Sequence, residues 1–104
     1  MPRVIVTASA RTDVLHRREF LREHSPQAAA RFGNTLADVI EVLSSNPRLG
    51  RPVVRVVGLY RLVIPFGNAN YAMYYRYLSD ADDIHVLSIR HSREADATSA
   101  QQSG

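Results

Sequence analysis

Five arginines lie in a stretch of the chain that has no acidic residue. Residues 42–79 contain no Asp or Glu, and their positive residues are Arg48, Arg51, Arg55, Arg61 and Arg76. Arginine makes bidentate contacts with phosphates and with carboxylates. This stretch therefore predicts a binding surface, either for nucleic acid or for an acidic protein partner.

All 13 basic residues of the chain are arginine, and lysine and cysteine are absent. This composition excludes a lysine general base, a Schiff base, a disulfide and a thiolate metal site. A bias of the source genome towards arginine codons explains the missing lysines equally well, but it does not explain the missing acids. His16, His24 and His85 have no spacing typical of metal ligands, so no metal and no cofactor are expected.

The length of 104 residues fits one domain with a two-layer core. Hydrophobic residues make up 45% and charged residues 22%, which is typical of globular proteins. No apolar run approaches the ~20 residues of a spanning helix, and the N-terminus lacks the apolar region of a secretory signal. The expected location is therefore the cytoplasm.

The N-terminal half predicts a strand and two helices. The β-branched run Arg3–Val6 reads as the strand. From Thr7 or Ser9 to His24, apolar residues recur at helical spacing. Ser25 and Pro26 then provide an N-cap and a first helical residue for a second helix that runs to about Ser45. So short a connection predicts an antiparallel helical hairpin over roughly residues 9–45.

The C-terminal half predicts sequential antiparallel strands at "VVRVV", "LYRLVIPF", "YAMYYRYL" and "DIHVLSIRH". Gly58 is expected to make a kink or turn, and "GNAN" a four-residue turn. The predicted fold is α+β, with the N-terminal strand in an antiparallel sheet and the hairpin packed on one face of it. The expected core comprises Val14, Phe32, Leu36, Ile40, Leu62, Ile64, Leu87 and Ile89. The domain is expected to span residues 1–94, followed by a disordered polar tail at residues 95–104.

This order of elements resembles the RelE/ParE superfamily, the toxins of type II toxin–antitoxin modules. The fragments that carry the resemblance are "SPQAAARF", "NPRLGRPV", "RLVIPFG", "YYRY" and "IRHSRE". Each fragment is weak alone, whereas their order and spacing together are fairly specific. An unrelated small α+β domain with a helical hairpin is the alternative. The resemblance implies a cognate antitoxin that wraps a segment, often acidic, around the toxin, beside the hairpin and along the sheet.

RelE-like members of the superfamily cut messenger RNA on the ribosome. Such chemistry needs a proton acceptor, a proton donor and cations around the phosphorane. The resemblance implies His91, Arg61 and Arg93 as catalytic residues if this chain is such an RNase, with Arg55 and Arg90 nearby. Because arginine stays protonated, His91 would carry the proton transfer. The alternative for His91 is a structural histidine that closes the last strand, and for Arg61 and Arg76 it is a solvated strand position.

ParE-like members poison DNA gyrase instead and lack the RNase residues. The missing lysines and the "SPQAAARF" and "GRPV" elements favour this side of the superfamily, or the related plasmid-stabilisation toxins, whose target is not readable from sequence. A gyrase poison needs a surface and no catalytic group. The arginines expected to bind the target or the antitoxin are Arg48, Arg51, Arg55, Arg61, Arg76 and Arg90. An RNase acting on the ribosome and its messenger is the second reading, and a nucleic-acid-binding module without catalysis the third.

Overall fold

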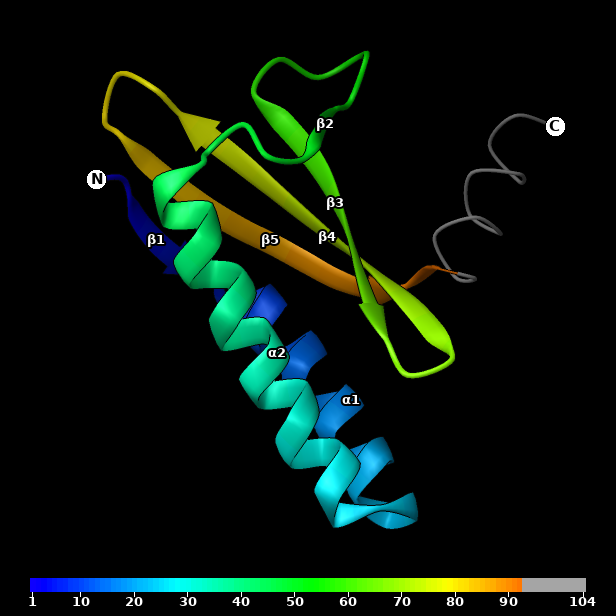
Figure 1. The fold of residues 1–104 in the computed structure, drawn as a ribbon. Coiled ribbons are helices and arrows are strands. Elements are labelled where there is room, and N and C mark those ends of the chain that lie inside the picture. The colour runs from blue at the N-terminus through cyan, green and yellow to red at the C-terminus, as the bar shows by residue number, and fades with distance from the viewer. Residues whose placement is uncertain (93–104) are drawn as a thin grey trace, which may run out of the picture.

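The computed structural model describes residues 1–92, in which two helices lie side by side across one face of a single sheet (Figure 1). Arg93 and the predicted tail lie outside the described residues. The elements in chain order are β1 (Arg3–Val6), α1 (Ala8–His24), α2 (Pro26–Ser45), β2 (Arg51–Pro52), β3 (Leu59–Phe66), β4 (Ala69–Leu78) and β5 (Asp83–His91).

Side-chain caps set the ends of the helical hairpin. The Thr7 hydroxyl accepts a hydrogen bond from the Ala10 N–H and donates one to the Val86 carbonyl, so it caps α1 and ties it to β5. Ser25 serves both helices: its N–H donates to the Leu21 carbonyl, and its hydroxyl accepts from the N–H of the first turn of α2. The predicted N-cap at Ser25, with Pro26 starting α2, is confirmed.

The strand order in the sheet is β1-β5-β4-β3-β2. Strands β3, β4 and β5 pair antiparallel, as predicted, and the short β2 pairs antiparallel with β3. Strand β1 was predicted in an antiparallel sheet, but it joins β5 in parallel and makes the sheet mixed. The α+β class with the hairpin on one face is confirmed. The sequence could not show the direction of β1, because its partner β5 is the last strand along the chain and no tight turn joins the two strands.

The core lies between the helices and the covered face of the sheet. Its largest fully buried side chains are Phe32, Leu43, Met73, Tyr75, Ile84 and Val86. Of the predicted core residues, Phe32, Leu36, Ile64 and Ile89 are buried, and Val14 and Leu62 pack partly buried against them. Ile40 and Leu87 are partly exposed, so their assignment to the core was wrong.

A β-bulge in β5 explains the error at Leu87. Tyr74 lies opposite Ser88 and Tyr75 opposite Val86, so Leu87 is an extra residue without a partner in β4. Strict alternation would place Leu87 and Ile89 on one face. The bulge instead shifts the alternation by one residue, so that Ile84, Val86 and Ile89 all face the helices.

The predicted strand at "VVRVV" is wrong, because residues 53–58 form a turn-rich loop between β2 and β3, at the top of Figure 1. The Val53 N–H donates to the Leu59 carbonyl at 2.8 Å, which closes the loop. Gly58 makes the predicted turn with φ 79°. The hairpin of β3 and β4 turns through residues 67–68 alone, two residues fewer than predicted, with Gly67 at φ 59°.

Candidate target-binding face

The face of the sheet opposite the two helices, called the outer face below, carries a central row of polar side chains. The strand register places Arg51 opposite Arg61, Arg61 opposite Tyr74, and Tyr74 opposite Ser88. Residues that are paired across neighbouring strands project to the same side of a sheet. The four side chains therefore cross the outer face from β2 to β5.

Two further arginines flank this row. Arg76 lies in register with His85, and Arg90 with Ala72, on either side of the row along the strands. Arg51, Arg76 and Arg90 are exposed, and Arg61 is partly buried. Four of the six predicted binding arginines therefore share one face.

A carboxylate at the edge of the outer face is already neutralised. Asp83 begins β5, and both of its oxygens accept hydrogen bonds from the Arg3 guanidinium, at 3.1 and 3.2 Å. This contact with Asp83 raises the pKa of Arg3, which stays charged. The positive charge of the central row is therefore not offset by Asp83.

Arg48 and Arg55 do not belong to this cluster. The Arg48 guanidinium carbon lies 5.0 Å from the ring centre of Tyr77. Tyr77 is in register with the buried Ile84, so Arg48 lies on the helix side of the sheet. Arg55 is exposed in the 53–58 loop. The arginines of the acid-free stretch therefore lie in three places: the outer face, the helix side of the sheet and the 53–58 loop.

His91 and Arg61 lie on opposite faces of the sheet. His91 is in register with Tyr71, which is 3% exposed under the helices, and the two rings meet edge to face at 5.5 Å. The guanidinium of Arg17 lies over the same Tyr71 ring at 5.5 Å. The structure thus does not bring His91 together with Arg61, and Arg93 lies outside the described residues.

His85 is the histidine that sequence reasoning missed. Because of the bulge at Leu87, His85 projects to the outer face while Ile89 and His91 project towards the helices. It stands opposite Arg76 on the neighbouring strand. Nothing in the sequence marked the bulge, so strict alternation put His85 and His91 on the same face.

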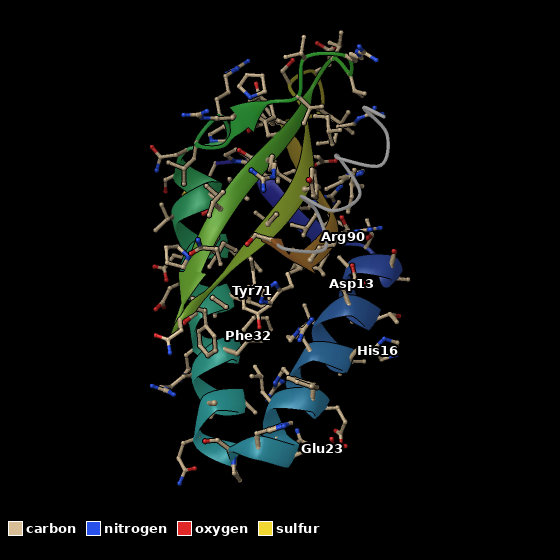
Figure 2. All side chains as sticks on the ribbon, turned by 90° about the vertical axis from the view of Figure 1, so that its right-hand side faces the viewer. Asp13, His16, Glu23, Phe32, Tyr71 and Arg90 are labelled. Atoms are coloured by element: carbon tan, nitrogen blue, oxygen red, sulfur yellow. The ribbon has the colours of Figure 1, made fainter. Side chains whose placement is uncertain are left out.

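A polar hollow lies between α1 and the end of β5. It measures about 320 Å³ and is lined by Asp13, His16, Arg17, Phe20, Ile89 and Arg90. Figure 2 shows Asp13 and His16 on α1 below Arg90. Asp13 accepts a hydrogen bond from the Ile89 N–H at 3.1 Å, so this carboxylate joins helix to sheet. Within residues 1–92, no group of three or more His, Asp or Glu could hold a metal ion.

The position of Arg51 depends on a buried tyrosine. The Tyr75 hydroxyl accepts a hydrogen bond from the Gly50 N–H at 2.9 Å, and its ring stacks on that of Tyr60 at 5.3 Å. Burial raises the pKa of Tyr75, which keeps the phenol neutral. A Cβ on Gly50 would lie 2.9 Å from the Arg61 carbonyl oxygen. This close packing fixes Arg51 beside Arg61.

Comparisons with known proteins identify the family. The family model described as the ParE toxin of the type II toxin–antitoxin system parDE matches residues 4–96. This chain belongs to the ParE toxin family. The predicted resemblance to the RelE/ParE superfamily is therefore confirmed, and the protein is a toxin of the type II toxin–antitoxin class.

The toxin is similar to a curated protein named Toxin RelE1 and, in its fold, to a solved structure. It is 34% identical over 94 residues to Toxin RelE1 of Caulobacter vibrioides, a match that covers 88% of this chain and 94% of the relative. Its fold is similar to that of a chain in the crystal structure of the toxin–antitoxin complex RelBE2 of Mycobacterium tuberculosis. That match has a TM-score of 0.56 and 22% identity, and covers 88% of the toxin and 99% of that chain.

The toxin also has an apolar groove between α2 and β3, lined in part by Leu49 and Leu62, close in sequence to Arg51 and Arg61 of the central row. It measures about 310 Å³, and Val42, Leu49 and Val63 along it are 50%, 47% and 45% exposed. Strand β2 pairs with Tyr60 and Arg61 alone, so residues 62–66 of β3 have no strand on that side within the described part of the chain. In that part, neither helix is long and apolar enough to cross a membrane.

Proposed function

We propose that this toxin acts in the cytoplasm by holding a macromolecular target on its outer face, and that DNA gyrase is the first candidate. The observation that carries the proposal is the separation of His91 from the arginines of the outer face. An arginine cluster binds carboxylates or phosphates strongly, but arginine is a poor base because it stays protonated. The arrangement therefore supports binding better than phosphodiester cleavage.

Cleavage of messenger RNA on the ribosome is the second candidate. It is favoured by the name of the relative Toxin RelE1 and by the position of His85 on the outer face. His85 stands beside Arg76 and near Tyr74, so a proton carrier and cations share one surface. If the toxin is an RNase, His85 takes the acid–base role for which the sequence suggested His91.

We further propose that a cognate antitoxin occupies the groove between α2 and β3. The supporting observations are the family membership, the exposed valines of the groove and the free edge of β3. An extended segment could pair with this edge and place apolar side chains in the groove. Acidic residues of the same segment could reach Arg61 or Arg51 at the end of the groove nearest β2.

One experiment separates the candidates. Purified toxin is given to gyrase with supercoiled DNA, and separately to a translating ribosome system. Trapped gyrase–DNA breaks with intact messenger are expected. Cleaved messenger with unaffected gyrase would contradict the gyrase proposal. Cleavage that falls by the ~10²- to 10⁴-fold of a lost acid–base group in His85→Ala, but not in His91→Ala, would establish the RNase alternative.

Tight DNA binding without either activity would point to a nucleic-acid-binding module. In that case the affinity should fall steeply with salt, because contacts between arginines and phosphates release counterions. In the same titration, the Arg51→Ala and Arg76→Ala variants should show a weaker dependence of DNA affinity on salt, because each has lost a phosphate contact.

A further inference from the structure

The loop at residues 53–58 exposes two large apolar side chains almost completely. Val54 is 98% exposed and Val57 is 97% exposed, more than any other large hydrophobic residue among those described, Met1 included. Single exposed apolar residues are common on protein surfaces. Two almost fully exposed valines, three positions apart on one short loop, are less common and are therefore candidates for contacts with a partner.

The loop that presents these valines is held by backbone hydrogen bonds. Besides the bond from Val53 to Leu59, the Val56 N–H donates to the Val53 carbonyl and the Leu59 N–H donates to the Val56 carbonyl, both at 3.2 Å. At the base of the loop, the Gly58 carbonyl accepts from the Tyr77 N–H at 2.9 Å. Valine is itself stiff about χ1. Ordering this loop in a complex therefore costs little conformational entropy.

The charges around the loop are mostly positive. Arg55 lies between the two valines in sequence, and Arg51 precedes the loop; both are exposed. One carboxylate comes near, because Asp80 from the turn between β4 and β5 lines a hollow beside Val57 together with Arg76. No other acid lies between positions 42 and 80 of the sequence. The loop thus exposes two valine side chains on a part of the surface where most charged side chains are arginines.

We propose that the 53–58 loop inserts Val54 and Val57 into an apolar hollow, rimmed by carboxylates, on the protein on which the toxin acts. This inference rests on the proposed function, since it names the surface of the toxin that enters a protein target. Valines contribute nothing to phosphate contacts, whereas an apolar hollow removes both from water. Carboxylates at its rim are complementary to Arg55 and Arg51.

The test compares growth arrest on induction of the toxin without antitoxin. The variant Val54→Ser/Val57→Ser is set against Leu15→Ser, which changes another exposed apolar residue, 58% exposed on α1. The loop variant should need a higher induction level to arrest growth than the wild type. We expect a factor of roughly 10 to 100 for each of the two valines, because each substitution removes an apolar contact with the target. The Leu15 variant should match the wild type, and thermal melting should show that both variants fold.

Each outcome decides something. Equal toxicity of the loop variant and the wild type would overturn the inference while leaving the proposed function in place. A wild type that does not arrest growth would overturn the proposed function, and the inference with it. If the loop variant loses toxicity together with affinity for duplex DNA, measured at two salt concentrations, the loop contacts nucleic acid and the protein hollow is refuted.

Discussion

The two faces of the sheet differ in what their side chains contact, although the same strands supply both. In β4, Tyr71, Met73 and Tyr75 are buried against the helices, while Tyr74 and Arg76 project to the outer face. Among residues 1–92 no polar or charged residue other than tyrosine is buried. The covered face therefore maintains the fold, and the outer face is left to interact. Changes on the first should alter stability, and changes on the second should alter toxicity.

The largest loss of stability is expected on the covered face, from Phe32→Ala. The Phe32 ring is fully buried and contacts the rings of Phe66 and Tyr71, at 5.3 and 5.0 Å between ring centres. Removing a buried phenylalanine costs about 3–5 kcal/mol, because transfer and cavity terms add. Unfolding in urea measures this change. A loss below about 1 kcal/mol would contradict the assignment of Phe32 to the centre of the core.

A smaller loss is expected from Tyr75→Phe. This change leaves the Gly50 N–H without its buried acceptor, which costs about 1–3 kcal/mol. Tyr74→Phe is the matched control, because it removes a hydroxyl from the outer face of the same strand and should leave the free energy of unfolding nearly unchanged. Equal losses in the two variants would show that the faces do not differ as described.

The stability that Tyr75 provides also depends on pH. Its pKa is raised in the folded protein, chiefly by burial, so its contribution is complete below about pH 10, the ordinary pKa of tyrosine. The contribution is lost as the pH rises through the raised pKa of the folded state. Stability measured from pH 8 to 11 should therefore fall less in Tyr75→Phe than in the wild type.

The smallest effect on stability is expected from Arg76→Ala on the outer face. Arg76 is exposed, and surface substitutions usually change the free energy of unfolding by less than about 0.5 kcal/mol. Toxicity should nevertheless decrease in this variant. A stability loss comparable to that of Tyr75→Phe would mean that Arg76 belongs to the fold as much as to the binding face.

Much of the fold could be predicted from the sequence because the signals were local. Ser25 and Pro26 marked the boundary between the helices, and the spacing of Phe32 and Leu36 marked the buried face of α2. The loop at residues 53–58 was misread as a strand because its valines favour strands, whereas its backbone forms turns. Propensity alone does not show whether a neighbouring strand is there to pair.

The candidate site was harder to predict because it depends on register. The missing acids singled out the arginines as candidates, but which of them share a face follows from strand pairing. One bulged residue, Leu87, separates the two histidines of β5, so that His85 lies on the outer face and His91 on the covered face. A bulge leaves no reliable mark in a single sequence.

The central claim is that the outer face carries the toxic activity and contributes little to the fold. The most direct test is growth arrest by Arg51→Glu/Arg76→Glu, compared with the control Arg11→Glu/Arg31→Glu, which alters exposed arginines on the helices and changes the net charge equally. Both variants should melt close to the wild type. We expect the first to lose toxicity and the control to keep it, whereas undiminished toxicity of a folded Arg51→Glu/Arg76→Glu protein would contradict the account.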